Sequence, residues 1–200
     1  DARAASALSK LRSAFVDLNE LRVTPPSEIV EIIGTDYPMG RAAAEEITRS
    51  LTAVFNKLHH LDLSFLKKSA KRSAETFLNS LDAVSPHARG VVVLRCLHGH
   101  AVPVDIHTHA YLQKAKCIPD DATTEQAQKL LTQEVSDREA GAIYVLIKKY
   151  ASAHAPRKLV EKAAAMAGAH THYTTPPPPP IMKTDPLKPV VAAHTDRKPT

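Results

Sequence analysis

The sequence predicts an all-α fold, and three observations support this prediction. Apolar residues recur at intervals of three and four over most of the chain, which is the spacing of amphipathic helices. Aromatic residues make up only 4% of the 200 residues and tryptophan is absent, so the core must consist mainly of Leu, Val, Ile and Ala. That composition suits packed helices. Residues that favour helix starts precede several of the apolar stretches.

Three helices are expected in the first part of the chain. The first covers 4–21, and its apolar stripe consists of Leu8, Leu11, Phe15 and Leu18. Prolines follow it, and a second helix runs from Ser27 to Gly34. The third covers 41–60, with an inner face of Ile47, Leu51, Val54, Phe55 and Leu58. Glu45 and Arg49 have the i,i+4 spacing of a surface ion pair.

The functional predictions depend on the stretch 81–109. Its beginning, 81–86, is typical of a tight turn between a helix at 71–79 and a following helix, because Asp, Ser and Pro favour turns and helix starts. The segment 90–97 is apolar apart from Arg95, and periodicity alone leaves a buried strand and a buried helix both open. Asp105 then stands just before a predicted helix at 106–115.

Three further helices are expected after a loop at 118–121. Thr123 and Gln126 form a capping-box pattern that opens a helix reaching about residue 135. Asp137 opens the next helix, whose apolar stripe is Ile143, Leu146, Ile147 and Tyr150. Pro156 starts an Ala-rich helix that ends near Gly168. Residues 169–200 are Pro-rich and include five consecutive prolines, so they are predicted to form a disordered tail that could bind a proline-binding partner.

Composition limits the compartment and the kind of partner. A formal net charge of +5 and a pI near 9.2 permit a polyanionic partner without requiring one. Two cysteines are too few for a disulfide scaffold, and Cys96, inside the apolar run, is predicted to be buried and inert. No membrane-length apolar run and no signal peptide are visible. We therefore expect a cytoplasmic protein, associated with the nucleoid if the source is bacterial.

The stretch 81–109 resembles endonuclease III and the related helix-hairpin-helix DNA glycosylases. That family carries a Leu-Pro-Gly-Val-Gly hairpin, a catalytic lysine two residues later in its lyase members, an apolar helix, and a Val-Asp-Thr-His motif. Here the hairpin corresponds to Leu81-Asp82-Ala83-Val84-Ser85 and the acid motif to Val104-Asp105-Ile106-His107. The resemblance begins near residues 15–23 and extends to about Tyr150, roughly three quarters of the chain.

The chain also departs from the family pattern. Ala83 and Ser85 replace the two hairpin glycines, and His87 stands at the lysine position, where it cannot form a Schiff base. Family members often have a glutamine that fills the gap left by the extruded base, and 33–36 contains none. No cysteine follows Cys117, so the iron–sulfur cluster of many relatives is not expected. These departures exclude the lyase route but leave simple base hydrolysis open.

The resemblance implies a two-lobed helical fold. One lobe, 23–114, would contain the hairpin, and the other would combine 1–22 with 115–168. The implied function is a monomeric base-excision-repair protein that binds double-stranded DNA and is at most a water-using DNA glycosylase. Asp105 would be the catalytic residue, stabilising positive charge on the sugar or directing a water. The hairpin N–H groups at Ala83, Val84 and Ser85 would hold phosphates.

Two neighbouring features have both a functional and an ordinary interpretation. The densest basic cluster is either a solvated helix face or a set of phosphate contacts beside the hairpin; it consists of Lys67, Lys68, Lys71 and Arg72. His87 is either a partly exposed residue at a helix start or a donor of a proton or a phosphate hydrogen bond near pH 6 to 7.

Two alternative functions stay open at this point. An Asp before a helix is often only an N-cap, and the protein would then be a catalytically inactive helical module that binds nucleic acid or protein. Zinc binding is a minor alternative, because histidines at 98, 100, 107 and 109 flank Asp105. Histidines two apart on a helix point roughly 200° apart, however. We therefore expect no metal site and no cofactor.

Overall fold

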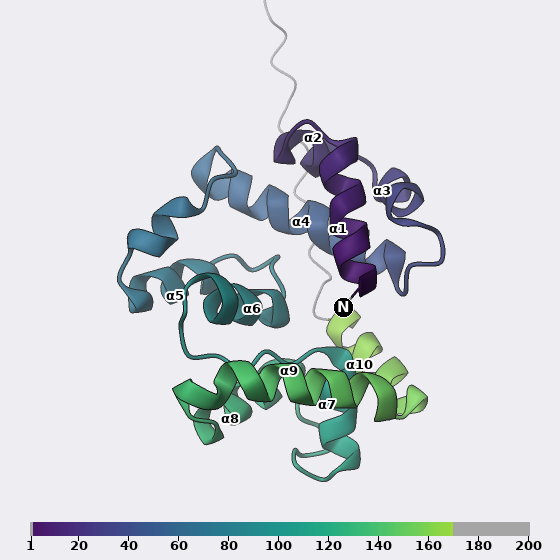
Figure 1. The fold of residues 1–200 in the computed structure, drawn as a ribbon, viewed down its shortest axis with the longest axis vertical. Coiled ribbons are helices and arrows are strands. Elements are labelled where there is room, and N and C mark those ends of the chain that lie inside the picture. Colours follow the sequence, from purple (N-terminus) through teal and green to yellow (C-terminus); the bar gives the residue numbers. More distant parts are fainter. Residues whose placement is uncertain (1, 170–200) are drawn as a thin grey trace, which may run out of the picture.

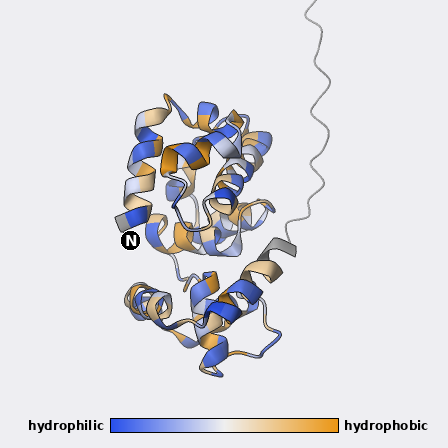
Figure 2. Cartoon of the chain, turned by 90° about the vertical axis from the view of Figure 1, so that its right-hand side faces the viewer, coloured by the Kyte–Doolittle hydropathy of each residue, from blue (hydrophilic) through white to orange (hydrophobic). Residues whose placement is uncertain are grey.

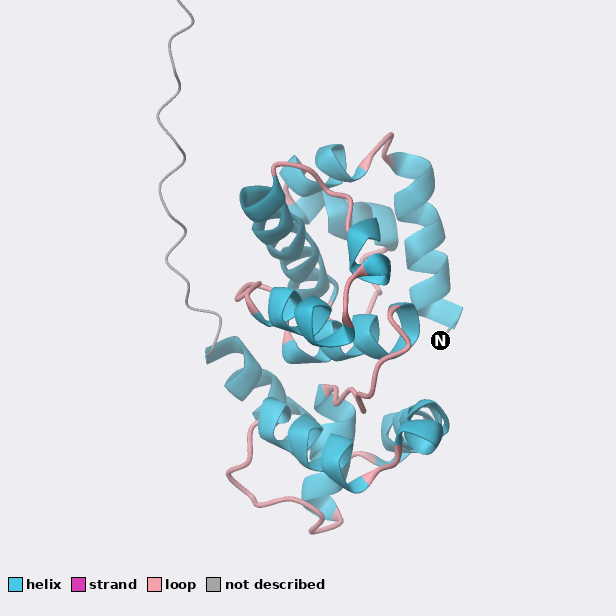
Figure 3. Cartoon of the chain, turned by 90° about the vertical axis from the view of Figure 1, so that its left-hand side faces the viewer, coloured by secondary structure: helices cyan, strands magenta, loops and turns pink. Residues whose placement is uncertain are grey.

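The computed structural model describes residues 2–169, which form helices and no strands (Figure 3). This confirms the all-α prediction. The elements are α1 (Ala2–Ala14), α2 (Leu18–Val23), α3 (Pro26–Ile33), α4 (Gly40–Leu58), the 3-10 helix η1 (Ser64–Lys68), α5 (Lys71–Asn79), α6 (Pro86–Cys96), α7 (Ile106–Lys114), α8 (Thr124–Glu134), α9 (Asp137–His154) and α10 (Arg157–Ala169). None of these helices combines the length and apolar character needed to cross a membrane. The predicted tail falls, apart from its first residue, outside the described residues.

The helices form two groups (Figure 1). We name α1 to α6 the N-terminal lobe and α7 to α10 the C-terminal lobe; both side views show one group above the other (Figures 2 and 3). The first helix, α1, packs against α3, and α7 packs against α9 and α10. Residues 2–22 therefore lie with α3 and α4, whereas the resemblance grouped 1–22 with 115–168. Helix α7 lies with the later helices and not with the hairpin.

Three apolar clusters form the cores of the two lobes. The first joins α1, α2, α3 and α4, and its buried members are Ala7, Leu11, Leu21, Ile29, Ile33 and Ala44. The second joins α4, η1, α5 and α6 through Val54, Leu66, Ala74, Leu78, Leu81, Val93 and Ala101. The third lies in the C-terminal lobe and contains Val104, Leu112, Ile118, Ala122 and Ala127. Along the helices, hydrophobic and hydrophilic residues are interspersed (Figure 2), as amphipathic packing requires.

The predicted helix at 4–21 is interrupted between α1 and α2. The Asp17 carboxylate accepts hydrogen bonds from the N–H groups of Asn19 and Glu20, both at 2.8 Å, and so caps α2. The Glu20 carboxylate accepts from the Val16 N–H at 2.7 Å. Such local side-chain bonds compete with continuous helix. As a result Leu18, predicted to face the core, is 50% exposed, and Leu21 is buried in its place.

The buried face of helix α9 overlaps the predicted one only in part. Its buried residues are Ala140, Tyr144 and Ala151, whereas Leu146 and Tyr150 are 62% and 52% exposed. The two alanines have small side chains, which allow α9 to pack closely on α7. In the predicted stripe, Ile143 and Ile147 are partly buried and Ile147 packs against the third apolar cluster. The prediction was therefore wrong for Leu146 and Tyr150 only.

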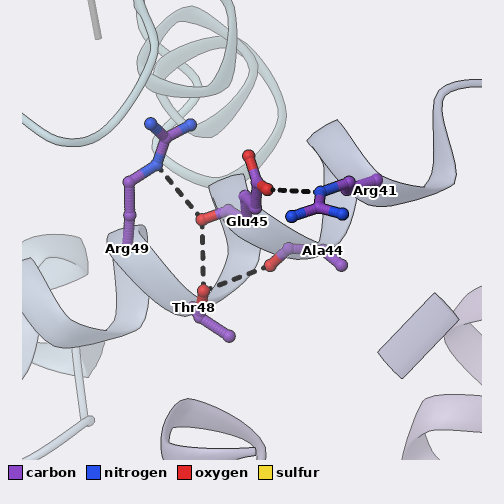
Figure 4. A network of polar contacts seen from close by, with 5 residues as sticks. All are labelled: Arg41, Ala44, Glu45, Thr48 and Arg49. Atoms are coloured by element: carbon purple, nitrogen blue, oxygen red, sulfur yellow. Dashed lines mark hydrogen bonds and ion pairs between the residues drawn. The ribbon is translucent and has the colours of Figure 1, made fainter. Parts of the chain in front are cut away.

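The surface pair predicted on α4 also differs in its partner. The Glu45 carboxylate accepts from Arg41 Nε at 3.0 Å, while Arg49 Nε donates to the backbone carbonyl of Glu45 at 3.2 Å (Figure 4). Thr48 Oγ1 donates to the same carbonyl at 3.2 Å. Because the Arg41 side chain is 88% exposed, this ion pair contributes only about 0.5 kcal/mol or less.

Candidate functional site

The turn between α5 and α6 forms as predicted. The Leu81 N–H donates to the Leu78 carbonyl at 3.2 Å, and the Val84 N–H donates to the Leu81 carbonyl at 3.0 Å. Ser85 then caps α6, because its Oγ accepts from the Ala88 N–H at 3.2 Å. Proline follows at the first helical position, where its missing N–H costs nothing. The chain thus builds a helix, a short turn and a second helix from local signals.

The turn does not need the glycines that the family pattern has there. Ala83 is not among the described residues with positive φ, and Ser85 has a φ of −62°. Neither position therefore requires the left-handed conformation that glycine adopts easily. Within the described part of the chain, the backbone N–H groups of Ala83 and Ser85 donate no hydrogen bond. The Asp82 N–H likewise donates none, so three N–H groups of the turn have no acceptor among the described residues.

The apolar run after the turn is helical. It lies in α6, where Gly90 and Val93 are buried, so the strand alternative is excluded. Cys96, predicted to be buried, is exposed. It is the last residue of α6, at the end of the helix and beyond the buried residues Gly90 and Val93.

An extended linker carries the chain from α6 to Asp105. Val102, Pro103 and Val104 are almost completely buried in it, so their backbone groups need partners. The side chains of α8 supply them: Thr132 Oγ1 accepts from the Val102 N–H at 3.0 Å, and Gln128 Oε1 accepts from the Val104 N–H at 3.2 Å. The Gln128 amide also donates to the Pro86 carbonyl at 3.2 Å. One side chain therefore ties the start of α6 to the residue preceding Asp105.

Asp105 lies at the N-terminus of α7. Its Oδ1 accepts from the Thr108 N–H at 2.8 Å, which caps the helix. Its Oδ2 is 3.9 Å from Lys148 Nζ on α9, and the Asp105 side chain is 19% exposed. Lys148 Nζ in turn donates to the Tyr144 hydroxyl at 3.4 Å. The carboxylate is thus structurally engaged on one oxygen and faces an ammonium group with the other.

His87, in the first turn of α6, lies near the Tyr144 side of this group. Its ring centroid is 6.4 Å from that of Tyr144, and its Nδ1 is buried with no hydrogen-bond partner among the described residues. Burial lowers the pKa of His87; the negative charge of Asp105 opposes this shift, Lys148 adds to it, and Glu46 opposes it. His87, Asp105, Tyr144 and Lys148 therefore form one polar cluster, which we name the junction cluster.

The basic cluster lies elsewhere. Lys67 and Lys68 end η1, and Lys71 and Arg72 begin α5, whereas the turn follows the other end of α5. A helix of this length separates its ends by about 12 Å. The structure thus brings Ala83, Val84, Ser85, His87 and Asp105 to one region and places the four cations at the far end of α5.

Sequence reasoning missed Lys148, Tyr144 and Gln128. Tyr144 and Lys148 have the i,i+4 spacing of neighbours on a helix face, which is the only signal they carry. Their contact with Asp105 depends on the packing of α9 against α7, which no local pattern specifies.

Two of the four histidines around Asp105 bond to backbone carbonyls. His109 is buried and its Nε2 donates to the Ala122 carbonyl at 2.7 Å, while His100 Nε2 donates to the Val135 carbonyl at 2.8 Å. Among residues 2–169, no three His, Cys, Asp or Glu side chains are grouped so that they could hold a metal ion.

Comparison with known proteins adds no relative. The chain matches no protein-family model, and no curated protein matches it. Function must therefore be argued from the residues and their geometry.

Proposed function

We propose that this chain is a DNA-binding, endonuclease III-like base-excision-repair protein without lyase chemistry, which binds double-stranded DNA at the α5–α6 turn and the junction cluster. The observation that carries the proposal is that the first turn of α6 holds His87, which lies beside Tyr144, while Lys148, bonded to the Tyr144 hydroxyl, faces Asp105. The proposal requires the turn and the carboxylate to act on the same stretch of DNA, and this arrangement supports it.

Phosphate binding would use the start of α6. The N–H groups of Ala83 and Ser85 are not used by the chain in its described part, and the positive end of the α6 dipole lies beside them. Such a helix start attracts phosphate oxygens without reading the base sequence. This would position the duplex and leave lesion choice to other groups.

Base release would use Asp105. A flipped nucleotide would present its sugar to the carboxylate, which would stabilise the positive charge that develops as the glycosidic bond breaks. Water would then take the place of the base. His87 has no primary amine and is mainly neutral at pH 7 because burial lowers its pKa, so strand cleavage through an imine at this position is not part of the proposal.

A second candidate is a catalytically inactive nucleic-acid-binding module. It is favoured by the engagement of Asp105, whose Oδ1 caps α7 and whose Oδ2 faces Lys148 at 3.9 Å. In this reading the carboxylate orders the start of α7 and takes no part in chemistry.

Asp105→Asn separates the two candidates. Asparagine caps helices as well as aspartate, so the fold should be retained, but the negative charge is lost. A glycosylase should lose about 100-fold or more in base release from damaged duplexes while its duplex affinity changes by less than about twofold. Asp17→Asn, which makes the same change at the cap of α2, is the matched control and should retain full activity.

Wild-type protein that binds duplex but releases no base would contradict the enzyme and leave the inactive module. Absence of duplex binding at low salt, where phosphate contacts are strongest, would remove both candidates.

A further inference from the structure

A cavity of about 400 Å³ lies at the end of α5 and α6 away from the turn. Its apolar floor includes Leu66, Ala74 and Val93, and Lys67, Lys71 and His98 also line it. Because the turn and Asp105 do not line it, this cavity is separate from the junction cluster. Its volume is within the range of small-molecule sites.

The cavity is rich in cations that the chain does not neutralise. Lys67, Lys68, Lys71 and Arg72 are all exposed, and within the described residues none of their side chains forms an ion pair or a hydrogen bond. Lys67 and Lys71 line the cavity, whereas Lys68 and Arg72 do not. The two lining lysines outnumber the one lining carboxylate, Glu75, so an anionic group would meet a net positive charge in the cavity, with two more cations beside it.

The start of α5 adds to this positive potential. Its first turn holds Lys71 and Arg72 with no acidic residue, and its cap, Ala70, makes no side-chain hydrogen bond. Cations at the positive end of a helix dipole cost up to about 1 kcal/mol. The two cations therefore destabilise the start of α5. A bound anion would reduce this repulsion.

The opposite wall is held in a left-handed turn. His98, which lines the cavity, has a φ of 49°, a conformation that costs a non-glycine residue about 1 kcal/mol. The Gly99 N–H donates to the Val93 carbonyl at 2.9 Å and closes the end of α6. The same left-handed conformation ends α4 at His59 and follows α7 at Lys116, so it is an ordinary way for a helix to end.

We propose that this cavity binds a mononucleotide, with its phosphate on Lys67 and Lys71 and its base on the apolar floor. A ligand with one anionic group and one flat, largely apolar group matches the separation of cations and apolar side chains in the cavity. Glu75, which also lines it, can accept a hydrogen bond from an amino group of the base. The proposal does not depend on the proposed repair function.

Calorimetry with adenosine 5′-monophosphate and the full chain tests the assignment. The double variant Lys67→Ala/Lys71→Ala should bind about tenfold or more weakly, because it loses charge-assisted hydrogen bonds to the phosphate. Lys68→Ala/Arg72→Ala removes the same charge outside the cavity and should change the affinity by less than about threefold. Equal losses in the two variants would overturn the proposal in favour of a diffuse basic surface. No binding by wild-type protein would also overturn it.

Cys96 supplies an independent readout, because it is exposed and lines the cavity. In a Cys117→Ser background, adenosine 5′-monophosphate should slow alkylation of the Cys96 thiol more than inorganic phosphate or adenosine does alone. Equal protection by inorganic phosphate would show that the apolar floor is not used and would overturn the nucleotide assignment. No protection by the nucleotide would overturn the cavity as its site.

Discussion

At the residue scale, the environment of His87 makes its protonation dependent on charged neighbours. Burial lowers its pKa, Asp105 and Glu46 oppose the shift, and Lys148 increases it. The pKa of the folded state is therefore below the unfolded value of about 6.5. The neutral ring contributes stability that is fully present above that pH and is lost as the pH falls through the folded pKa.

Substitution of the two charged partners should move this pKa in opposite directions. Asp105→Asn removes an opposing negative charge and should lower the pKa of His87 further. Lys148→Met removes a positive charge and should raise it. An NMR titration of the imidazole signals measures both shifts, and the exposed His154 serves as an internal control. A His87 pKa that is the same in wild type and both variants would contradict the junction cluster.

Single residues of this site were partly visible in the sequence. Asp105 and His87 stand at motif positions, and Asp105 carries the local signature of a helix cap. The contact between Asp105 and Lys148 joins two different helices, so only the packing of α7 against α9 reveals it.

At the element scale, Gly90 has no side chain, and this leaves room for the Gln128 amide between α6 and α8. A Cβ atom at Gly90 would lie 2.9 Å from Gln128 Nε2 and 3.0 Å from its Oε1. Gln128 cannot move freely, because it accepts from the Val104 N–H and donates to the Pro86 carbonyl.

Gly90→Ala should therefore destabilise the protein by about 1–3 kcal/mol, although alanine favours helix, because displaced Gln128 leaves a buried N–H without a partner. Urea unfolding measures the change. In a Gln128→Ala background the same substitution should be neutral or stabilising by up to about 1 kcal/mol. Equal effects in the two backgrounds would show that Gln128 does not couple these helices.

The sequence predicted where helices begin and end better than it predicted which faces they bury. Ser85 and the Thr123–Gln126 capping box act within three residues, so their patterns were sufficient. The break at Asp17 was equally local but was overlooked, because the apolar spacing continues across it. The inner face of α9 depends on close packing at alanines, which apolar patterns rank below leucine and tyrosine.

At the scale of the whole molecule, the two lobes meet along the buried linker and the contacts of α6 with α8 and α9. The all-α class followed from composition and periodicity. The grouping of α1 with α3 did not, because Leu11 and Ile29 meet only in the folded chain. The position of the basic cluster did not follow either: the sequence suggested phosphate contacts beside the hairpin, whereas the cluster lies one length of α5 away from the turn.

The central claim is that the start of α6 binds phosphate beside Asp105. It is tested by comparing the affinities of two variants, Ser85→Asp and Ser27→Asp, for duplex DNA. Aspartate caps a helix as well as serine, so Ser85→Asp should keep the fold while placing a negative charge at the phosphate site. Ser27 is exposed in the first turn of α3, where the same change is a matched control. We expect Ser85→Asp to weaken binding about tenfold and to reduce the salt slope by about one, with Ser27→Asp close to wild type. Equal affinities and salt slopes for the two variants would contradict the account.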